Sequence, residues 1–148
     1  MIVISYPRRP LRRPLFRLEF TAFCEANREA YLRYARERID DPAEARRCVD
    51  TVLNTLEARW IAVLGSECPA AQVWRDLRAE TGHRTIGPAG RAMKFHAVLA
   101  DDQADIMLLH HHLRLSVDRA ARLMGLADHD ARALLRGAER NLGSLRDR

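Results

Sequence analysis

The chain has 148 residues, of which 47% are hydrophobic and 30% charged, and its formal net charge at pH 7 is +5. This composition excludes general disorder, and the length excludes a large enzyme core while leaving room for one ordinary domain or two small helical modules. Glycine is scarce, at 7 residues, and Ala, Leu and Arg are abundant, which favours helices over sheets.

Most of the excess positive charge lies in the first 20 residues, where five arginines and the single acidic residue Glu19 leave a net charge of +4. Residues 6–14 combine three prolines with four arginines, and proline removes a helical hydrogen-bond donor. We therefore predict that residues 1–18 form a flexible basic arm. Its role stays open between a contact with phosphate or an acidic surface and a solvated terminus.

Helical periodicity begins at Glu19, and apolar residues at intervals of three, four and seven then line one face. These residues are Phe20, Phe23, Ala30, Tyr31 and Tyr34. A second helix starts where Asp41 can cap it, Pro42 suits its first position and Glu44 can complete a capping box. It carries the strongest apolar stripe of the chain, formed by Ala45, Cys48, Val49, Val52, Leu53, Leu56, Trp60, Val63 and Leu64.

A third helix begins at Pro69 and completes a predicted three-helix bundle. Its apolar side consists of Ala70, Val73, Trp74 and Leu77. Turn-forming residues over 81–90 predict a linker, after which residues 92–113 have a helical pattern. The predicted organisation is an arm over 1–18, a helical module over 19–80, a linker over 81–90 and a second module over 91–148.

Residues 113–142 predict a helix-turn-helix. Ser116 can cap a short helix, Ala120 and Ala121 allow close approach of another helix, and Gly125 gives the turn its backbone freedom. A second helix follows over 128–142 and buries Ala131, Leu134, Leu135, Ala138 and Leu142. The predicted class is all-α, with an N-terminal three-helix bundle and a C-terminal helix-turn-helix module.

Several segments together resemble the short RNA polymerase sigma factors of the extracytoplasmic-function type. Residues 23–35, 41–45 and 69–75 are similar to the helices that bind the polymerase clamp and the melted promoter. The rear segments are similar to the region whose helix-turn-helix binds the upstream promoter element, and they are residues 106–109, 120–126 and 134–138. The resemblance implies a transcription regulator whose partners are core RNA polymerase, promoter DNA and a regulatory protein such as an anti-sigma factor. The widely spaced cysteines and the lack of a secretory signal separately predict a cytoplasmic protein.

The resemblance also implies two sets of site residues. The expected DNA-binding residues are Arg119, Arg122, His129, Arg132, Arg136 and Arg140. The expected polymerase-binding residues are Arg46, Arg47, Asp50 and Asn54. For Arg132 and Arg136, which share a helix face, the alternative is a solvated face or an ion pair with Glu139 or Asp128.

Charge distribution favours a second hypothesis, an adaptor or inhibitor that keeps the sigma-like fold and acts through protein contacts. Arg46 and Arg47 stand where the family carries an acidic pair, and such a reversal would repel a basic partner surface. Asp128 and Asp130 lie near the helix end that approaches DNA in the family. A third hypothesis is a self-associating helical protein without a role in transcription.

Other chemistries find little support in the sequence. Cys24, Cys48 and Cys68 are widely spaced and predict reduced thiols, with Cys48 acting as a small hydrophobic residue. The run 110–112 contains three histidines, which point about 100° apart on a helix and cannot share one metal ion. No membrane span, cofactor, metal site or catalytic residue is expected, because the chain lacks the corresponding segments and motifs.

Overall fold

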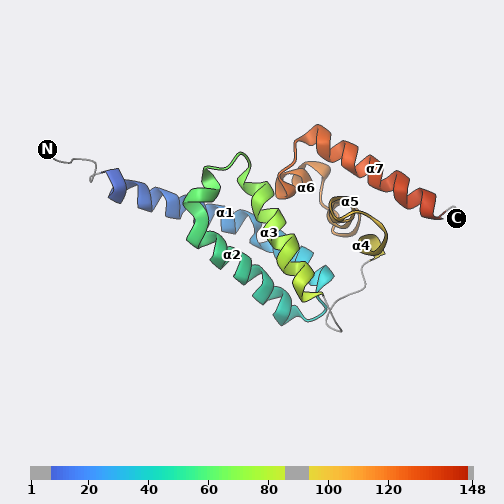
Figure 1. Ribbon diagram of the computed structural model, residues 1–148, viewed down its shortest axis with the longest axis horizontal. Helices are drawn as coiled ribbons and strands as arrows, with labels where there is room; N and C mark the ends of the chain where they lie inside the picture. The colour runs from blue at the N-terminus through green and yellow to red at the C-terminus, as the bar shows by residue number, and fades with distance from the viewer. Residues whose placement is uncertain (1–7, 86–93, 147–148) are drawn as a thin grey trace.

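The computed structural model of the chain describes residues 8–85 and 94–146, with side chains described for 17–85 and 95–145. The described residues form seven α-helices and one π-helical segment, with no strand among them (Figure 1). The predicted all-α class is therefore confirmed for this part of the chain. All three cysteines are free, and Cys24 and Cys48 are buried, as expected of thiols that pack as small apolar groups.

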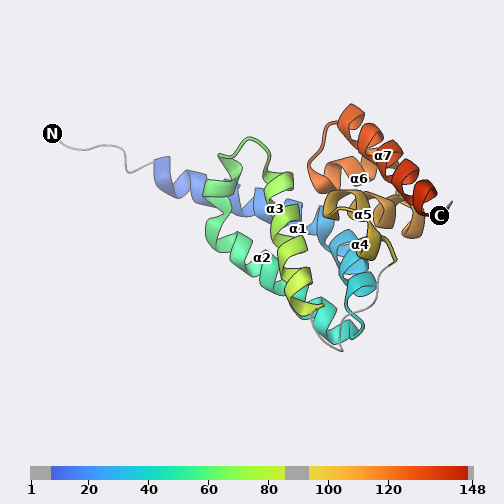
Figure 2. The same cartoon turned by 45° about the vertical axis from the view of Figure 1, so that its right-hand side comes forward.

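The first helix is longer than predicted. Helix α1 (Arg8–Arg38) includes the segment from Arg8 to Leu18, so the prediction of a flexible arm is wrong for these residues. Pro10 is tolerated because it lies in the first helical turn, whose N–H groups have no partner within the helix. The start of α1 extends beyond the other helices (Figures 1 and 2). Residues 1–7 of the predicted arm lie outside the described residues.

Helix α2 (Pro42–Leu64) begins as predicted. The carboxylate of Asp41 accepts a hydrogen bond of 3.0 Å from the N–H of Ala43, and Pro42 occupies the first turn. The expected capping box does not form, because the carboxylate of Glu44 accepts hydrogen bonds from Arg47 and Arg84 instead. Charged partners compete well for a carboxylate that could otherwise reach the helix start.

The first three helices enclose an aromatic core. Tyr34 and Trp74 lie with ring centroids 4.7 Å apart, and Trp74 belongs to α3 (Pro69–Arg84). The rings of Phe20 and Phe23 pack against Trp60 of α2, with centroid separations of 5.5 and 5.4 Å. Aromatic pairs at such separations add to the free energy gained by burying their area. The predicted three-helix bundle is thus present.

Helix α3 continues through the start of the predicted linker. Thr81 is fully buried and its hydroxyl donates to the carbonyl oxygen of Leu77 at 2.6 Å, so this residue extends the helix. The expectation of a break at Thr81 is wrong because the hydroxyl is satisfied by the helix itself. Residues 86–93 of the predicted linker lie outside the described residues.

The predicted helix over 92–113 is divided into three pieces. These are α4 (Lys94–Val98), α5 (Asp101–Met107) and the π-helical segment η1 (Leu108–His112). Ala100 interrupts the run because its backbone is extended, with φ −60° and ψ 154°. The last two helices are α6 (Val117–Met124) and α7 (Asp128–Arg146).

The N-terminal and C-terminal helices form one packed structure. Helix α7 packs on α5, and α6 packs on α3 and η1, as Figures 1 and 2 both show for α6 and the start of α3. Buried apolar residues from all of these helices belong to a single core. No helix in the described ranges is long and apolar enough to cross a membrane.

Candidate nucleic-acid interface

A short, sharply defined connection joins α6 to α7. The hydroxyl of Ser116 accepts a hydrogen bond of 3.0 Å from the N–H of Arg119, which confirms the predicted cap of α6. Gly125 ends α6 in the left-handed conformation, at φ 73°, and the N–H of Leu126 donates to the carbonyl of Ala121. Glycine adopts this conformation without the steric cost of a side chain, as the sequence predicted for this position.

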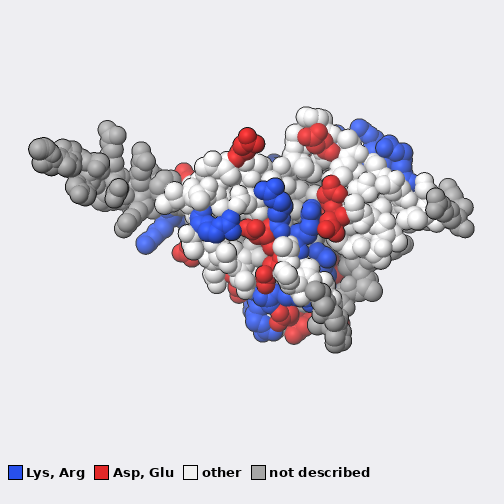
Figure 3. Space-filling model, in the orientation of Figure 1, with Lys and Arg blue, Asp and Glu red and all other residues white. Residues whose placement is uncertain are grey.

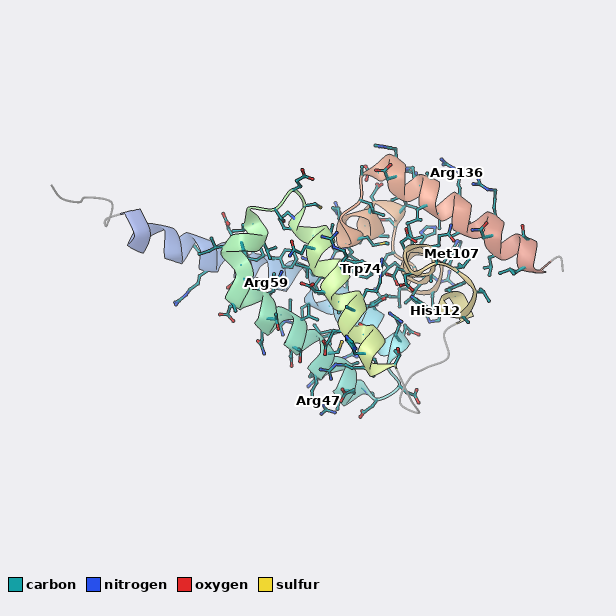
Figure 4. The ribbon with its side chains drawn as sticks, in the orientation of Figure 1. Arg47, Arg59, Trp74, Met107, His112 and Arg136 are labelled. Carbon is teal, nitrogen blue, oxygen red and sulfur yellow. The ribbon has the colours of Figure 1, made fainter. Side chains whose placement is uncertain are left out.

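Helix α7 buries one face and exposes the other. The buried residues Ala131, Leu135, Ala138 and Leu142 recur at intervals of three and four and were all predicted. Arg132, Arg136 and Arg140 are spaced four residues apart, so they form a row along the exposed side of α7. In Figure 3, basic atoms gather along the outer edge of α7, and Figure 4 places Arg136 on the side facing away from the α1–α3 bundle.

Three of the predicted DNA-binding arginines are free to take an external ligand. Arg122, Arg136 and Arg140 are exposed and form no hydrogen bond or ion pair with the described part of the chain. Their guanidinium groups are therefore fully available donors. A phosphate oxygen is a strong acceptor for such donors, because both partners are charged.

The other three predicted DNA-binding residues have partners within the chain. Arg119 is half-buried and donates to the carbonyl of Ala26 in α1 at 2.7 Å. Arg132 forms an exposed ion pair with Asp118 at 3.2 Å, so its partner is neither of the two carboxylates that the sequence suggested. His129 lies 3.3 Å from the carboxylate of Asp130, in the acidic first turn of α7. DNA contacts by these three residues would compete with the existing interactions.

The four residues expected to contact polymerase lie on α2. Arg46, Asp50 and Asn54 are spaced four apart and share one side of the helix. Asp50 forms an ion pair of 3.5 Å with Arg28 of α1, and Arg47 pairs with Glu44 within its own helix. Arg46 and Asn54 are exposed without a partner among the described residues. The structure thus brings these residues to one polar surface of mixed charge.

The three histidines of η1 point to separate partners. His110 contacts the carbonyl of Leu115 at 2.8 Å, His111 contacts Glu139 of α7 at 3.2 Å, and His112 contacts Glu37 of α1 at 2.8 Å. Within the described ranges, no group of three or more His, Cys, Asp or Glu side chains is placed to hold a metal ion. The histidines instead connect η1 with the helices on either side of it.

A buried carboxylate at the centre of the molecule was not anticipated from the sequence. Asp105 of α5 is fully buried, and its two oxygens accept hydrogen bonds from four side chains of three other helices. The donors and their distances are Tyr34 at 2.7 Å, His96 at 2.8 Å, Arg78 at 2.7 Å and Trp74 at 3.0 Å. Figure 4 shows Trp74 on the side of α3 that faces α5.

The network keeps Asp105 ionised despite its burial. Burial by itself raises the pKa of the carboxyl group, because the charged form loses its water. The hydrogen bonds from His96 and Tyr34 and the charge of Arg78 outweigh this effect, so the pKa of Asp105 is below its usual value. The sequence held one indication of this role, because Asp105 immediately precedes the apolar run 106–109.

The α6–α7 connection is also tightly packed against the first bundle. A side chain at Gly125 would place its Cβ 2.3 Å from the backbone nitrogen of Ala71, near the start of α3. The thiol of Cys68 lies 3.5 Å from the carbonyl oxygen of Gly125, and Arg33 of α1 donates to the carbonyl of Leu113 at 2.7 Å. The predicted modules 19–80 and 91–148 are therefore in close contact.

Comparisons of the chain with models of protein families, with curated proteins and with solved structures gave no match. The function proposed for the chain therefore depends on its own residues and their geometry.

Proposed function

We propose that the protein is a sigma-factor-like transcription regulator that associates with core RNA polymerase and contacts promoter DNA. The single observation that carries this proposal is the exposed row of Arg132, Arg136 and Arg140 on α7. The row lies on the second helix of a pair whose sharp connection is typical of a helix-turn-helix. DNA phosphates supply most of the affinity in such contacts, and arginine binds them through paired hydrogen bonds.

The polar surface of α2 is proposed as the contact with core polymerase. Arg46, Asp50 and Asn54 lie in one row, and none of them contributes to the buried core. Their side chains can therefore change without loss of packing. Arg59, on the same helix, is separated from Arg46 by about 220° of helical rotation and pairs with Asp76 of α3. It serves as a matched control on the opposite side.

Pull-down of core RNA polymerase by the full chain tests the proposal, followed by run-off transcription from promoter templates. The expected result is binding of core that is strongly reduced by Asp50→Arg combined with Asn54→Arg, because added positive charge repels a basic partner surface, and unchanged by Arg59→Glu. Promoter-dependent transcripts should require Arg136. Absence of core binding by the wild-type chain would exclude this function.

A second candidate function is supported by the docking of α6. In an adaptor or inhibitor of a transcription complex, the fold would act through protein contacts without sequence-specific DNA binding. Two observations favour it. The guanidinium group of Arg119 already donates a hydrogen bond to the carbonyl of Ala26, and the first turn of α7 carries the acidic residues Asp128 and Asp130, which repel DNA phosphates. Core binding without promoter-dependent initiation, together with reduced transcription by another sigma factor, would favour this candidate.

A further inference from the structure

An open cavity of about 490 Å³ lies beside the buried network. Its walls come from α1, α3 and α5 and consist of Arg38, Arg75, Arg78, Ala79, Gly82, Thr85 and Asp101. The volume is within the range of about 300–1000 Å³ that holds small organic ligands. Figure 3 shows basic atoms gathered between α3 and α5, with acidic atoms beside them. The cavity is distinct from the exposed row of arginines on α7.

The lining carries an excess of positive charge. Three arginines face one aspartate, and because the charge of Arg78 is paired with buried Asp105, Arg38 and Arg75 against Asp101 leave a formal excess of one positive charge. Placing like charges together is unfavourable unless an anion or solvent compensates them. Guanidinium groups suit phosphate in particular, because their paired donors match two phosphate oxygens. The charge and the geometry thus favour a ligand with phosphate groups over a neutral or cationic one.

Two of the arginines are held in position before any ligand binds. Arg38 donates to the hydroxyl of Tyr34 at 3.0 Å and lies over its ring, with 5.8 Å between the guanidinium carbon and the ring centroid. Arg78 donates to Asp105 through Nε at 2.7 Å, so its two terminal nitrogens have no partner among the described residues. Such fixed donors lose little conformational freedom when a ligand binds.

We propose that this cavity binds a small phosphate-bearing anion of nucleotide size. Arg38 and Arg75 contact the phosphate groups from α1 and α3, while Arg78 contributes through its terminal nitrogens. Asp101 of α5 lines the cavity on the remaining side and excludes a larger negative charge there. Because the cavity combines residues of the first bundle with α5, bound anion stabilises the packed arrangement of the two parts. The site therefore links a small ligand to the docking of the C-terminal helices.

Calorimetric titration of the full chain with inorganic pyrophosphate at low ionic strength tests the proposal. Expected are saturable binding of one pyrophosphate per chain and a rise in the melting temperature. Arg38→Gln and Arg75→Gln should each weaken binding by about tenfold, since each removes a charged pair of donors. Arg36→Gln is the control, because Arg36 is exposed on α1 and does not line the cavity. Equal weakening by Arg36→Gln, or no saturable binding, would overturn the proposal.

A second pair of variants tests the cavity without removing an arginine. A Cβ added at Gly82 would meet no heavy atom within 4 Å, so the position accepts the start of a side chain in Gly82→Glu and Gly82→Gln. The glutamate should abolish pyrophosphate binding by placing its own carboxylate among the arginines, whereas the uncharged glutamine should weaken it less. Equal effects of the two substitutions would contradict an electrostatic site.

A single-stranded oligonucleotide separates this site from a nucleic-acid surface. Its binding should be unaffected by Gly82→Glu and reduced by changes on α7. If Gly82→Glu abolished oligonucleotide binding while pyrophosphate failed to bind the wild-type chain, the cavity would serve nucleic acid and the proposal would be wrong.

Discussion

The hydroxyl of Tyr34 donates a hydrogen bond of 2.7 Å to the carboxylate of Asp105, which lies 71 residues later in the chain. Tyr34 is in the middle of the first bundle and Asp105 is in α5, so this bond joins the two parts that the sequence predicted as separate modules. Both groups are fully buried. A buried acceptor of this kind stabilises only the arrangement that satisfies it, since an unsatisfied charge in the interior is very costly.

Replacing Asp105 should therefore destabilise the protein severely. The substitution Asp105→Asn removes the charge that pairs with Arg78. It also replaces one acceptor oxygen by an NH2 group, which faces neighbours that are themselves donors and so cannot form the same hydrogen bonds. We expect the free energy of unfolding to fall by about 3–5 kcal/mol, as for other buried ion pairs that lose one partner. Urea unfolding followed by circular dichroism measures this loss.

Two further variants define the contribution of the buried network. Tyr34→Phe removes one charge-assisted hydrogen bond and should cost about 1.5–3 kcal/mol. Asp101→Asn changes an exposed carboxylate of the same helix and should alter stability by less than about 0.5 kcal/mol. Similar losses for Asp101→Asn and Asp105→Asn would show that the buried network has no special role in stability.

Acid should weaken the fold through the same carboxyl group. The pKa of Asp105 is lower in the folded protein than in the unfolded chain, where it has the usual aspartate value of about 4. As the pH falls below about 4, the unfolded chain therefore binds a proton at Asp105 more readily than the folded chain does. The stabilisation by Asp105 is thus fully present above that value and is lost as the pH falls through the lower, folded-state pKa. Unfolding free energies measured between pH 6 and 2.5 should decrease steeply at the acidic end.

The Asp105→Asn variant provides the comparison for the pH dependence. Its unfolding free energy should decrease less steeply between pH 4 and 2.5, because the titrating carboxyl is absent. The unfolding free energy of the variant should still decrease somewhat with falling pH, since hydrogen bonds from Arg47 and Arg84 also lower the pKa of Glu44. Identical slopes for the variant and the wild type would assign the acid sensitivity to other groups.

Local structure followed closely from local sequence. The cap at Asp41, the start of α3 at Pro69, the cap at Ser116 and the turn at Gly125 were all predicted, because each depends on neighbouring residues alone. The buried faces of α2 and α7 were predicted from helical spacing. The same helical spacing predicted that the three arginines of the candidate interface share the exposed face of α7.

Features that depend on distant partners could not be derived in this way. Trp74 and Tyr34 were predicted as core residues, but their donation to Asp105 requires α5 to lie against α1 and α3. Arg119 pairs with a carbonyl 93 residues away, and nothing in its sequence neighbourhood specifies that partner. The continuation of α3 through Thr81 likewise depends on a buried environment, because propensity alone favours a break there.

Gly125 should be one of the least replaceable residues of the chain. Gly125→Ala forces alanine to φ 73° and places its Cβ 2.3 Å from the backbone of Ala71. We expect a loss of about 2–5 kcal/mol from backbone strain and overpacking combined. Thermal and urea unfolding measure it. Gly143→Ala in α7 is the matched control, because its Cβ would meet nothing within 4 Å and alanine stabilises a helix by up to about 1 kcal/mol.

The free arginines of α7 should determine the salt dependence of DNA binding. Arg136→Gln and Arg140→Gln should each weaken binding to duplex DNA and reduce the slope of log affinity against log salt by about 0.9, as expected for one lost phosphate contact. Arg132→Gln should have a smaller effect, because Arg132 is already paired with Asp118. Fluorescence anisotropy at several salt concentrations measures these slopes. Unchanged slopes for all three variants would favour the function through protein contacts.

The thiols should differ in reactivity according to their position in the fold. Burial raises the pKa of both Cys24 and Cys48, which leaves less of the reactive thiolate at neutral pH. Cys68 is half-buried, with its Sγ atom 3.5 Å from the carbonyl of Gly125. Labelling of the native protein with a thiol-specific disulfide reagent should therefore modify Cys68 first, and Cys68→Ser should remove this fast phase.

Because the modified side chain of Cys68 would press against the turn after α6, labelling should also lower the melting temperature. Equal rates for all three cysteines would show that the packing of α2 against α1 and α3 does not protect Cys24 and Cys48 in solution.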